Sequence, residues 1–468
     1  MMGRLRAMRE PLKYVQGRDA TLKFHEEMGY MGKRWLFVCS NSGYKACHDK
    51  IEKSFGELDD YRRYEVFGGI SSKGEIAKME EIVKADNIDT VVAVGGGSAV
   101  DTAKATAYYT GKHIVIVPTV AATDAPCTGL SVIYNDDHSF DKYLFYPTNP
   151  DAVMVDTTVI ANAPVKFLIA GMGDALGTYF EGRASIRTES ASLEGTGITR
   201  AGQALARLCY DTLKTYGKQA VEACKVHAVT PALEAICEAN VYLSGVGADN
   251  VNCAAAHSFY NGVTSLGIKH ADHGCCVALG TLVQLVLEGA PKEEFEEVQN
   301  FCLEVGLPVT LEEIGVTTPE QVETIAKNAC IPGETIHNLA GDVQPIELYD
   351  AIMQADAMGK IALEYIFLRS SVVCNVHKLN SNIVRPGIIC ISLNIVRLIV
   401  LYESSCKINT NILAFAKTSH RQQIGDSRAC DMSACEIHHH ICRIILAVFA
   451  VDLITKLVKI RILKVCIS

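Results

Sequence analysis

Short β-branched apolar runs recur through roughly the first 160 residues, and the segments between them carry apolar residues at helical spacing. The runs predict buried strands at 34–39 (RWLFVC), 89–95 (DTVVAVG), 113–118 (HIVIVP) and 151–156 (DAVMVD). The intervening segments predict amphipathic helices within 43–55 and 73–87. Strands and helices that alternate in this way predict a mostly parallel sheet with both faces covered by helices.

The pattern changes at Asn162, where long segments rich in alanine and leucine begin. Pro164 lies where the first of these segments begins, and Thr-Pro-Glu marks another helix start within 317–330. We therefore expect an α/β domain over residues 1–162 and an all-α domain over residues 163–365.

Composition narrows the classes of function. The chain has 468 residues, of which 49% are hydrophobic and 21% charged, so it can bury a large core in two or three domains. A net charge of -9 without concentrated basic segments argues against a nucleic-acid partner and favours small molecules. The first residues lack the apolar core of a secretory signal, so we expect a cytoplasmic protein. The 18 cysteines lack paired spacings and are interpreted as reduced thiols.

Three glycines, Gly95, Gly96 and Gly97, join a predicted strand to a helical segment that begins near Ser98. Glycines let a backbone approach a diphosphate closely, and the free N–H groups of a helix N-terminus face its charge. The run is not the GxGxxG fingerprint, and a tight turn in which the glycines serve only packing is the alternative. The next predicted strand ends in a polar loop that contains Asp124, at the sheet edge where such folds bind ligands.

Histidines and aspartates gather in the otherwise small and apolar stretch 254–274. We expect His257 on a helix and His273 at the start of the next helix, so that a short loop can bring the two imidazoles together. Asp174, which we expect just before a helix, is the candidate third ligand for Zn²⁺ or Fe²⁺. His270 could replace His273 as a ligand, and a histidine that only packs in the core is the alternative for His257.

Several motifs occur in the order found in glycerol dehydrogenases, which belong to the iron-containing (group III) alcohol dehydrogenase family. They are KYVQG, VGGGSAVDTAK, PTVAATDAPCTGLSVIY, GMGDALGTYFE, AAAHSFYNG, His273-Gly274 and GETIHNLAGD. The resemblance covers roughly residues 12–365 and is specific, because independent motifs keep their register. It implies an N-terminal dinucleotide-binding α/β domain and an all-α metal-binding domain, an architecture that dehydroquinate synthase shares, with the active site between them.

The resemblance also implies roles for individual residues. Asp174, His257 and His273 would hold the metal ion, usually Zn²⁺ in such enzymes, and Asp124 would contact the substrate hydroxyls. The diphosphate-binding turn would comprise Gly95, Gly96, Gly97, Ser98 and Ala99. Further cofactor contacts are implied for Thr119, Thr128, Leu130 and Tyr134.

The implied activity is hydride transfer between glycerol, or a related 1,2-diol, and a nicotinamide cofactor, by a homo-oligomer. NAD is favoured. NADP stays open, because the segment Cys39-Ser40-Asn41-Ser42 contains no carboxylate that would repel the 2′-phosphate of NADP. The alternatives are a reductase or dehydrogenase of another hydroxyketone or a phosphorylated polyol, and a catalytically silent member of the family.

Residues 366–468 carry none of these motifs. Charged residues interrupt their apolar runs, so we expect no membrane span: Arg397, Arg443, Asp452 and Lys456. We interpret this tail as translated sequence beyond the ancestral end, poorly packed and without its own function, and its His438-His439-His440 cluster as incidental. A partner interface is the alternative.

Overall fold

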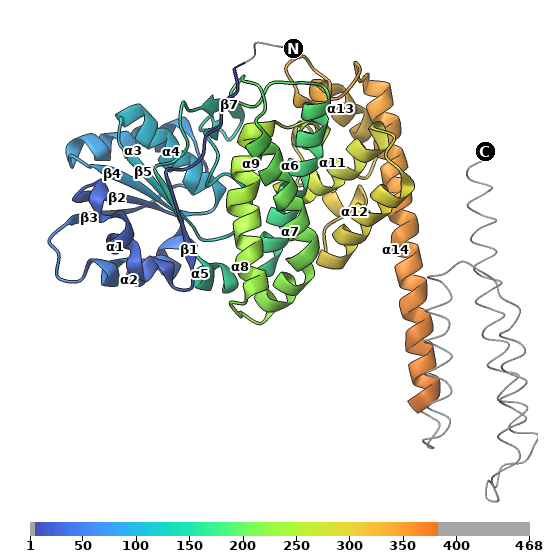
Figure 1. Ribbon diagram of the computed structural model, residues 1–468, viewed down its shortest axis with the longest axis horizontal. Coiled ribbons are helices and arrows are strands. Elements are labelled where there is room, and N and C mark those ends of the chain that lie inside the picture. Colours follow the sequence, from blue (N-terminus) through green and yellow to red (C-terminus); the bar gives the residue numbers. More distant parts are fainter. Residues whose placement is uncertain (1–4, 382–468) are drawn as a thin grey trace, which may run out of the picture. The chain divides into compact units, whose positions relative to one another are not determined.

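A six-stranded parallel sheet is the centre of the N-terminal part of the molecule (Figure 1). The computed structural model describes residues 5–381, with side chains through residue 367. The strand order is β1-β8-β5-β4-β2-β3, and all neighbouring strands pair in parallel. The strands are β1 (Lys13–Gly17), β2 (Arg34–Cys39), β3 (Tyr61–Val66), β4 (Thr90–Gly95), β5 (His113–Pro118) and β8 (Ala152–Asp156).

The four predicted strands are confirmed as β2, β4, β5 and β8, each within one residue of its expected bounds. The two edge strands, β1 and β3, were missed. Five of the six residues of β3 are only half-buried and the sixth is exposed, and its sequence, YRRYEV, is mostly polar. A strand at the edge of a sheet pairs on one side only and tolerates charge, so apolar runs do not reveal it.

Helices cover both faces of the sheet, and successive residues of β2 show this. Leu36 and Val38 enter one apolar cluster with Val100, whereas Trp35 and Phe37 enter another on the opposite face. Each fully buried side chain of this kind stabilises the fold by about 1.5–3 kcal/mol. The helices of this part are α1 (Phe24–Met28), α2 (Asn41–Phe55), α3 (Lys73–Ala85) and α4 (Gly97–Thr110).

An antiparallel hairpin follows β5 and consists of β6 (Leu130–Tyr134) and β7 (Phe140–Phe145). It packs against α4 through β6. The segment between β5 and β6, residues 119–129, leaves the carboxyl end of the sheet. This segment contains Asp124.

The rest of the described chain is helical, as expected, and Figure 1 shows its long helices beside the sheet domain. Pro164 immediately precedes α6, and Thr318 with Gln321 forms a capping box at α13. The helices are α5 (Thr157–Ala161), α6 (Val165–Arg187), α7 (Arg200–Lys225), α8 (Pro231–Glu238), the π-helical turn η3 (Ala239–Leu243), α9 (Ser244–Val251), α10 (Ala255–Thr264), α11 (His273–Leu287), α12 (Lys292–Val305), α13 (Pro319–Ala329) and α14 (Pro345–Ser381). Short 3-10 turns are η1 (Ala20–Lys23), η2 (Gly29–Met31), η4 (Glu312–Ile314) and η5 (Thr335–Asn338).

Residues 1–368 form one compact unit. The predicted domain boundaries at residues 162 and 365 stay predictions, and α14 continues past the second of them to Ser381. The rest of the predicted tail, including His438-His439-His440, lies outside the described residues. Among the described helices, none is both long and apolar enough to cross a membrane. The cysteines whose side chains the structure describes are all free, and their reduced state stays a prediction.

Candidate active site

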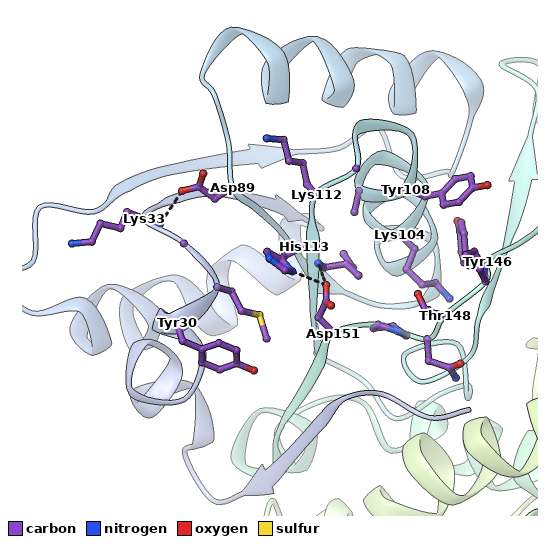
Figure 2. A pocket seen from close by; sticks show the side chains of 18 residues that line it. Tyr30, Lys33, Asp89, Lys104, Tyr108, Lys112, His113, Tyr146, Thr148 and Asp151 are labelled. Carbon is purple, nitrogen blue, oxygen red and sulfur yellow. Dashed lines mark hydrogen bonds and ion pairs between the residues drawn. The ribbon is translucent and has the colours of Figure 1, made fainter. Parts of the chain in front are cut away.

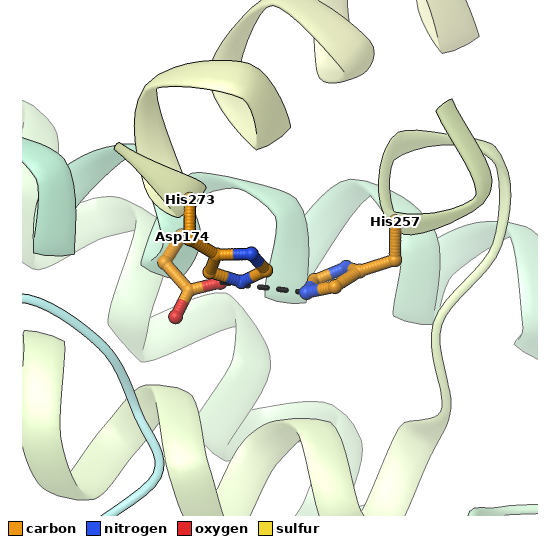
Figure 3. A group of neighbouring side chains, drawn as sticks. All are labelled: Asp174, His257 and His273. Atoms are coloured by element: carbon orange, nitrogen blue, oxygen red, sulfur yellow. Dashed lines mark hydrogen bonds and ion pairs between the residues drawn. The ribbon is translucent and has the colours of Figure 1, made fainter. Parts of the chain in front are cut away.

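Three helices bring Asp174, His257 and His273 together (Figure 3). Asp174 lies in the middle of α6, His257 in the first turn of α10, and His273 is the first residue of α11. Their ligand atoms all lie within 4.8 Å of one another. The expected positions of both histidines are confirmed. The expectation that Asp174 precedes a helix was wrong, because α6 runs through its glycines without a break.

Those glycines set the geometry of the cluster. A Cβ atom built on Gly173 would lie 2.2 Å from the carbonyl oxygen of Gly274, and one on Gly274 would lie 1.8 Å from the carbonyl oxygen of Ala170. Real Cβ atoms do not approach backbone this closely, so α6 and α11 touch backbone to backbone only because both positions are glycine. This contact places Asp174 beside His273.

The spacing of the three side chains fits a metal ion. Asp174 Oδ1 lies 3.0 Å from His273 Nε2 and 3.4 Å from His257 Nε2. Two tetrahedral ligands at the usual zinc bond lengths lie about 3.4 Å apart. One carboxylate and two imidazoles are also a donor set that Zn²⁺ and Fe²⁺ accept, and three protein ligands leave a position for substrate.

The charges of the cluster suit a cation as well. Burial opposes ionisation of Asp174, but the imidazoles of His273 and His257 outweigh it and lower the pKa of the carboxyl. Burial likewise opposes protonation of His257, but Cys253, Glu181 and Asp174 outweigh it and raise its pKa well above the ordinary value. The almost fully buried carboxylate of Asp174 thus faces Nε2 of both His257 and His273, and its negative charge stabilises a positive charge between them.

Glu181 is a site residue that sequence reasoning missed. Its Oε2 lies 2.5 Å from His257 Nδ1, and its side chain is 1% exposed. Glu181 follows Asp174 by seven residues, which on a helix is two turns along the same face, so the spacing carried the signal. Glu181, Cys253 and His257 form a second group of potential metal ligands. A separation of 2.5 Å is a hydrogen-bond distance and too short for two ligands of one tetrahedral ion.

The loop between β5 and β6 brings Asp124 to the same place. The backbone N–H of Asp124 donates to Asp174 Oδ2 over 3.2 Å, and Ser244 Oγ donates to the Asp124 carboxylate over 3.4 Å. Burial, followed by the charge of Asp174, raises the pKa of Asp124 well above its ordinary value. A carboxyl with this environment, beside the three clustered side chains, is placed to hydrogen-bond a substrate hydroxyl.

His270 and Asp272 do not join the cluster. The His270 ring donates through Nδ1 to the carbonyl of Ala271 over 2.7 Å. Asp272 is exposed and forms an ion pair with Lys166 at 3.5 Å. The alternative in which His270 replaces His273 as ligand therefore finds no support in the geometry.

The triple-glycine turn lies at the N-terminus of α4, where the first N–H groups, those of Gly97 and Ser98, have no acceptor within the helix. A Cβ on Gly95 would lie 2.7 Å from the Cβ of Ala99, so packing requires glycine there. A Cβ on Gly97 would lie 3.8 Å from Thr123 Oγ1, an ordinary contact. Packing alone thus explains Gly95 but not Gly97, which favours the interpretation that a ligand approaches this backbone.

The other predicted cofactor positions lie on the segment that follows β5. Thr119 donates its N–H to the carbonyl of Gly95 over 3.0 Å, which places it beside the glycine turn. Tyr134, at the end of β6, donates its N–H to the carbonyl of Ser71 over 2.9 Å. Thr128 and Leu130 lie over α4, where both of their carbonyls accept hydrogen bonds from Lys104 Nζ.

Lys104 was also missed by sequence reasoning. Its side chain is 2% exposed, and Nζ donates to the carbonyl of Ala125 over 2.8 Å as well as to those of Thr128 and Leu130. Burial lowers the pKa of Lys104, although Asp101 and other carboxylates oppose this. The ammonium holds together the loop that carries Asp124.

A cavity of about 780 Å³ opens at the amino ends of the parallel strands β4, β5 and β8, away from the candidate site (Figure 2). Both acidic side chains that line it bind backbone: Asp89 accepts hydrogen bonds from the N–H groups of Lys33 and Arg34, and Asp151 accepts one from the N–H of Ile114. None of the predicted site residues lines this cavity. In open α/β sheets, ligands bind at the carboxyl ends of the strands, on the other side.

Comparison with known proteins identifies the family to which the chain belongs. The family model described as iron-containing alcohol dehydrogenase matches residues 11–157. A glycerol dehydrogenase of Pseudomonas putida is 42% identical over 363 residues, which are 77% of this chain and all of that protein. A glycolaldehyde reductase of Halobacterium salinarum is 41% identical over 355 residues, 75% of this chain and 97% of that protein.

A solved structure gives the same result for the fold. The crystal structure of glycerol dehydrogenase from Schizosaccharomyces pombe matches with a TM-score of 0.74 and 36% identity, over 78% of this chain and 93% of that one. Identity above 40% across complete relatives confirms the resemblance drawn from the motifs. The chain belongs to the iron-containing alcohol dehydrogenase family.

Proposed function

We propose that this protein is a glycerol dehydrogenase, which uses NAD and a divalent metal ion to oxidise glycerol to dihydroxyacetone. The observation that carries the proposal is the convergence of Asp174, His257 and His273 beside Asp124. Membership of a family whose similar members include glycerol dehydrogenases supports it. Asp174, His257 and His273 would hold the metal ion, and their residue types accept both Zn²⁺ and Fe²⁺.

When bound, the metal ion would supply Lewis acidity to a substrate hydroxyl, and NAD would accept a hydride. The chain supplies position and charge around them. The free N–H groups of Gly97 and Ser98 would hold the diphosphate at the N-terminus of α4. Asp124 would hydrogen-bond the vicinal hydroxyl, which favours 1,2-diols over simple alcohols.

The segment 119–129 connects the two halves of this site. The backbone of Thr119 donates to Gly95 in the glycine turn, and the backbone of Asp124, in the same segment, donates to the proposed ligand Asp174. Hydride transfer requires that the reacting atoms of the cofactor and the substrate lie close together and aligned. A single segment that contacts both proposed binding positions would hold the two molecules in this arrangement.

The alternatives have weaker support. A phosphorylated polyol needs cations beside the site. Lys104, a buried cation whose charge acts on Asp124, is already bonded to the carbonyls of Ala125, Thr128 and Leu130. A silent member of the family would not need all three candidate ligands to converge. Reduction of a hydroxyaldehyde or another hydroxyketone uses the same groups in the reverse direction and is the second candidate. NADP use, a cytoplasmic location and a homo-oligomer stay predictions.

The first test is an assay of the purified full chain. With NAD and either glycerol or 1,2-propanediol, we expect reduced nicotinamide to accumulate, as measured by its absorbance. Treatment with a chelator should abolish the rate, and added Zn²⁺ should restore it. NADP and glycerol phosphate are run in parallel to test the alternatives. Absence of any rate with every diol and both cofactors would favour the silent protein.

The second test concerns the tail. We expect a chain that ends at residue 366 to retain the turnover of the full chain within about twofold. In α14, the last buried residue of the described chain is Gly359, and residues 364–367 are exposed, so the truncation removes no described buried side chain. A truncated protein that stays folded, by circular dichroism, yet loses all turnover would refute the interpretation of the tail as functionless.

A further inference from the structure

We propose that Glu181 is a positioning residue that fixes the tautomer and orientation of His257, and that it thereby sets the affinity of the site for its metal ion. The inference rests on the proposed function, because it assumes that His257 is a ligand. It adds a residue to which neither the motifs nor the resemblance assigned a role.

The contacts of Glu181 all converge on the start of α10. Oε1 accepts the backbone N–H groups of Ala254 and His257, over 2.7 and 2.9 Å. Oε2 accepts from His257 Nδ1 over 2.5 Å. One carboxylate, almost completely buried, therefore holds both the backbone and the ring of His257.

These contacts choose between the two ring nitrogens. A carboxylate offers only acceptors, so Nδ1 carries a proton whether the ring is neutral or charged. Nε2 faces Asp174 Oδ1 at 3.4 Å, and this carboxylate also offers only lone pairs. Without a metal ion, a proton on Nε2 would bridge these two atoms, and the position of that proton is the one from which a metal ion would bind Nε2. Glu181 thus presents His257 in the form in which Nε2 binds a metal ion.

His273 is held differently. Its ring packs edge-on against Tyr260, with centroids 4.3 Å apart, and its Nε2 also faces Asp174. An apolar edge contact restrains the plane of the ring but does not select a tautomer. The effect of removing the acidic partner should therefore be specific to His257.

The test is Glu181→Gln, which keeps the shape of the side chain. The amide oxygen can still accept the two backbone N–H groups, but the amide nitrogen then donates to Nδ1 and forces the ring proton onto Nε2. Flipping the amide instead would set its nitrogen against two backbone N–H groups. We expect the affinity for Zn²⁺, measured by competition with a chromophoric chelator, to fall about 10- to 100-fold.

One variant serves as the control. Asp356→Asn removes a carboxylate that is also almost fully buried, which accepts from the N–H of Leu311 over 2.9 Å and pairs with Lys360. It should bind Zn²⁺ within about threefold of the parent chain. Thermal unfolding of the metal-free proteins separates loss of stability from loss of affinity.

The outcomes separate this inference from the proposed function. A parent chain that binds no Zn²⁺ would overturn both. A parent chain that binds Zn²⁺, together with an E181Q variant of equal affinity, would overturn only the role of Glu181, as would an equal loss in D356N. Should E181Q fail to fold, Glu181→Asp is measured instead: its shorter reach cannot serve Nδ1 and both N–H groups, so its affinity should fall at least about threefold.

Discussion

Replacing His257 with alanine is expected to lower kcat/KM for glycerol by about a thousandfold or more. A metal ion contributes several kcal/mol of transition-state stabilisation, and about 4 kcal/mol corresponds to three orders of magnitude. The fold should persist, because the His257 side chain is 21% exposed and its removal leaves no large apolar void. Steady-state kinetics at fixed Zn²⁺, with circular dichroism for the fold, measure the effect.

The matched control is His270→Ala, a change of the same kind 13 positions along the chain. His270 contacts the neighbouring Ala271 carbonyl and lies outside the cluster, so turnover should stay within about twofold of the parent. If H257A kept its turnover, His257 would no longer belong to the site. If H270A lost it, the alternative ligand would have to be reconsidered.

Replacing Gly274 with alanine is expected to destabilise the fold more than a glycine-to-alanine change at any other described glycine. The new Cβ would lie 1.8 Å from the carbonyl oxygen of Ala170, and only a shift of α11 away from α6 relieves this. Alanine favours a helix over glycine by about 1 kcal/mol, but overpacking of this severity costs more. We expect a net loss of about 2–3 kcal/mol in the free energy of unfolding, measured with urea, and loss of Zn²⁺ binding.

Cys275→Ala provides the comparison for this second variant, because Cys275 is the next residue of α11 and is only half-buried. It should change the free energy of unfolding by less than about 1 kcal/mol. A G274A protein as stable as its parent, with Zn²⁺ still bound, would show that α6 and α11 can separate without disturbing the ligands.

The sequence predicted those parts of the fold whose signal is local. The central strands are unbroken apolar runs because helices bury both of their faces, so β2, β4, β5 and β8 could be located almost to the residue. The edge strand β3 carries arginine and glutamate and resembles a loop. Helix starts marked by Pro164 and Thr318 were equally local, because capping depends on neighbours in sequence.

The site could be predicted only in part. His257 and His273 lie near helix starts, as the spacing suggested, but their convergence with Asp174 depends on where α6 crosses α11. That crossing is set by Gly173 and Gly274, 101 residues apart, and no periodic pattern records it. Asp174 was expected just before a helix, whereas α6 begins at Val165 and runs through it. For Glu181, the sequence offers only its position seven residues after Asp174 on the same helix face. Its role becomes apparent only from its contacts with the start of α10.

The buried ammonium of Lys104 has a further consequence for catalysis. A polar loop beside a reaction centre ordinarily fluctuates, and each binding event must then arrest it at an entropic cost of roughly 0.5–1.5 kcal/mol for every side chain that becomes ordered. Here two carbonyls of that loop, and a third at the start of β6, accept hydrogen bonds from one ammonium group on α4. The loss of freedom would thus occur once, when the chain folds, and the surface proposed to bind a diol would need little further ordering when the diol binds.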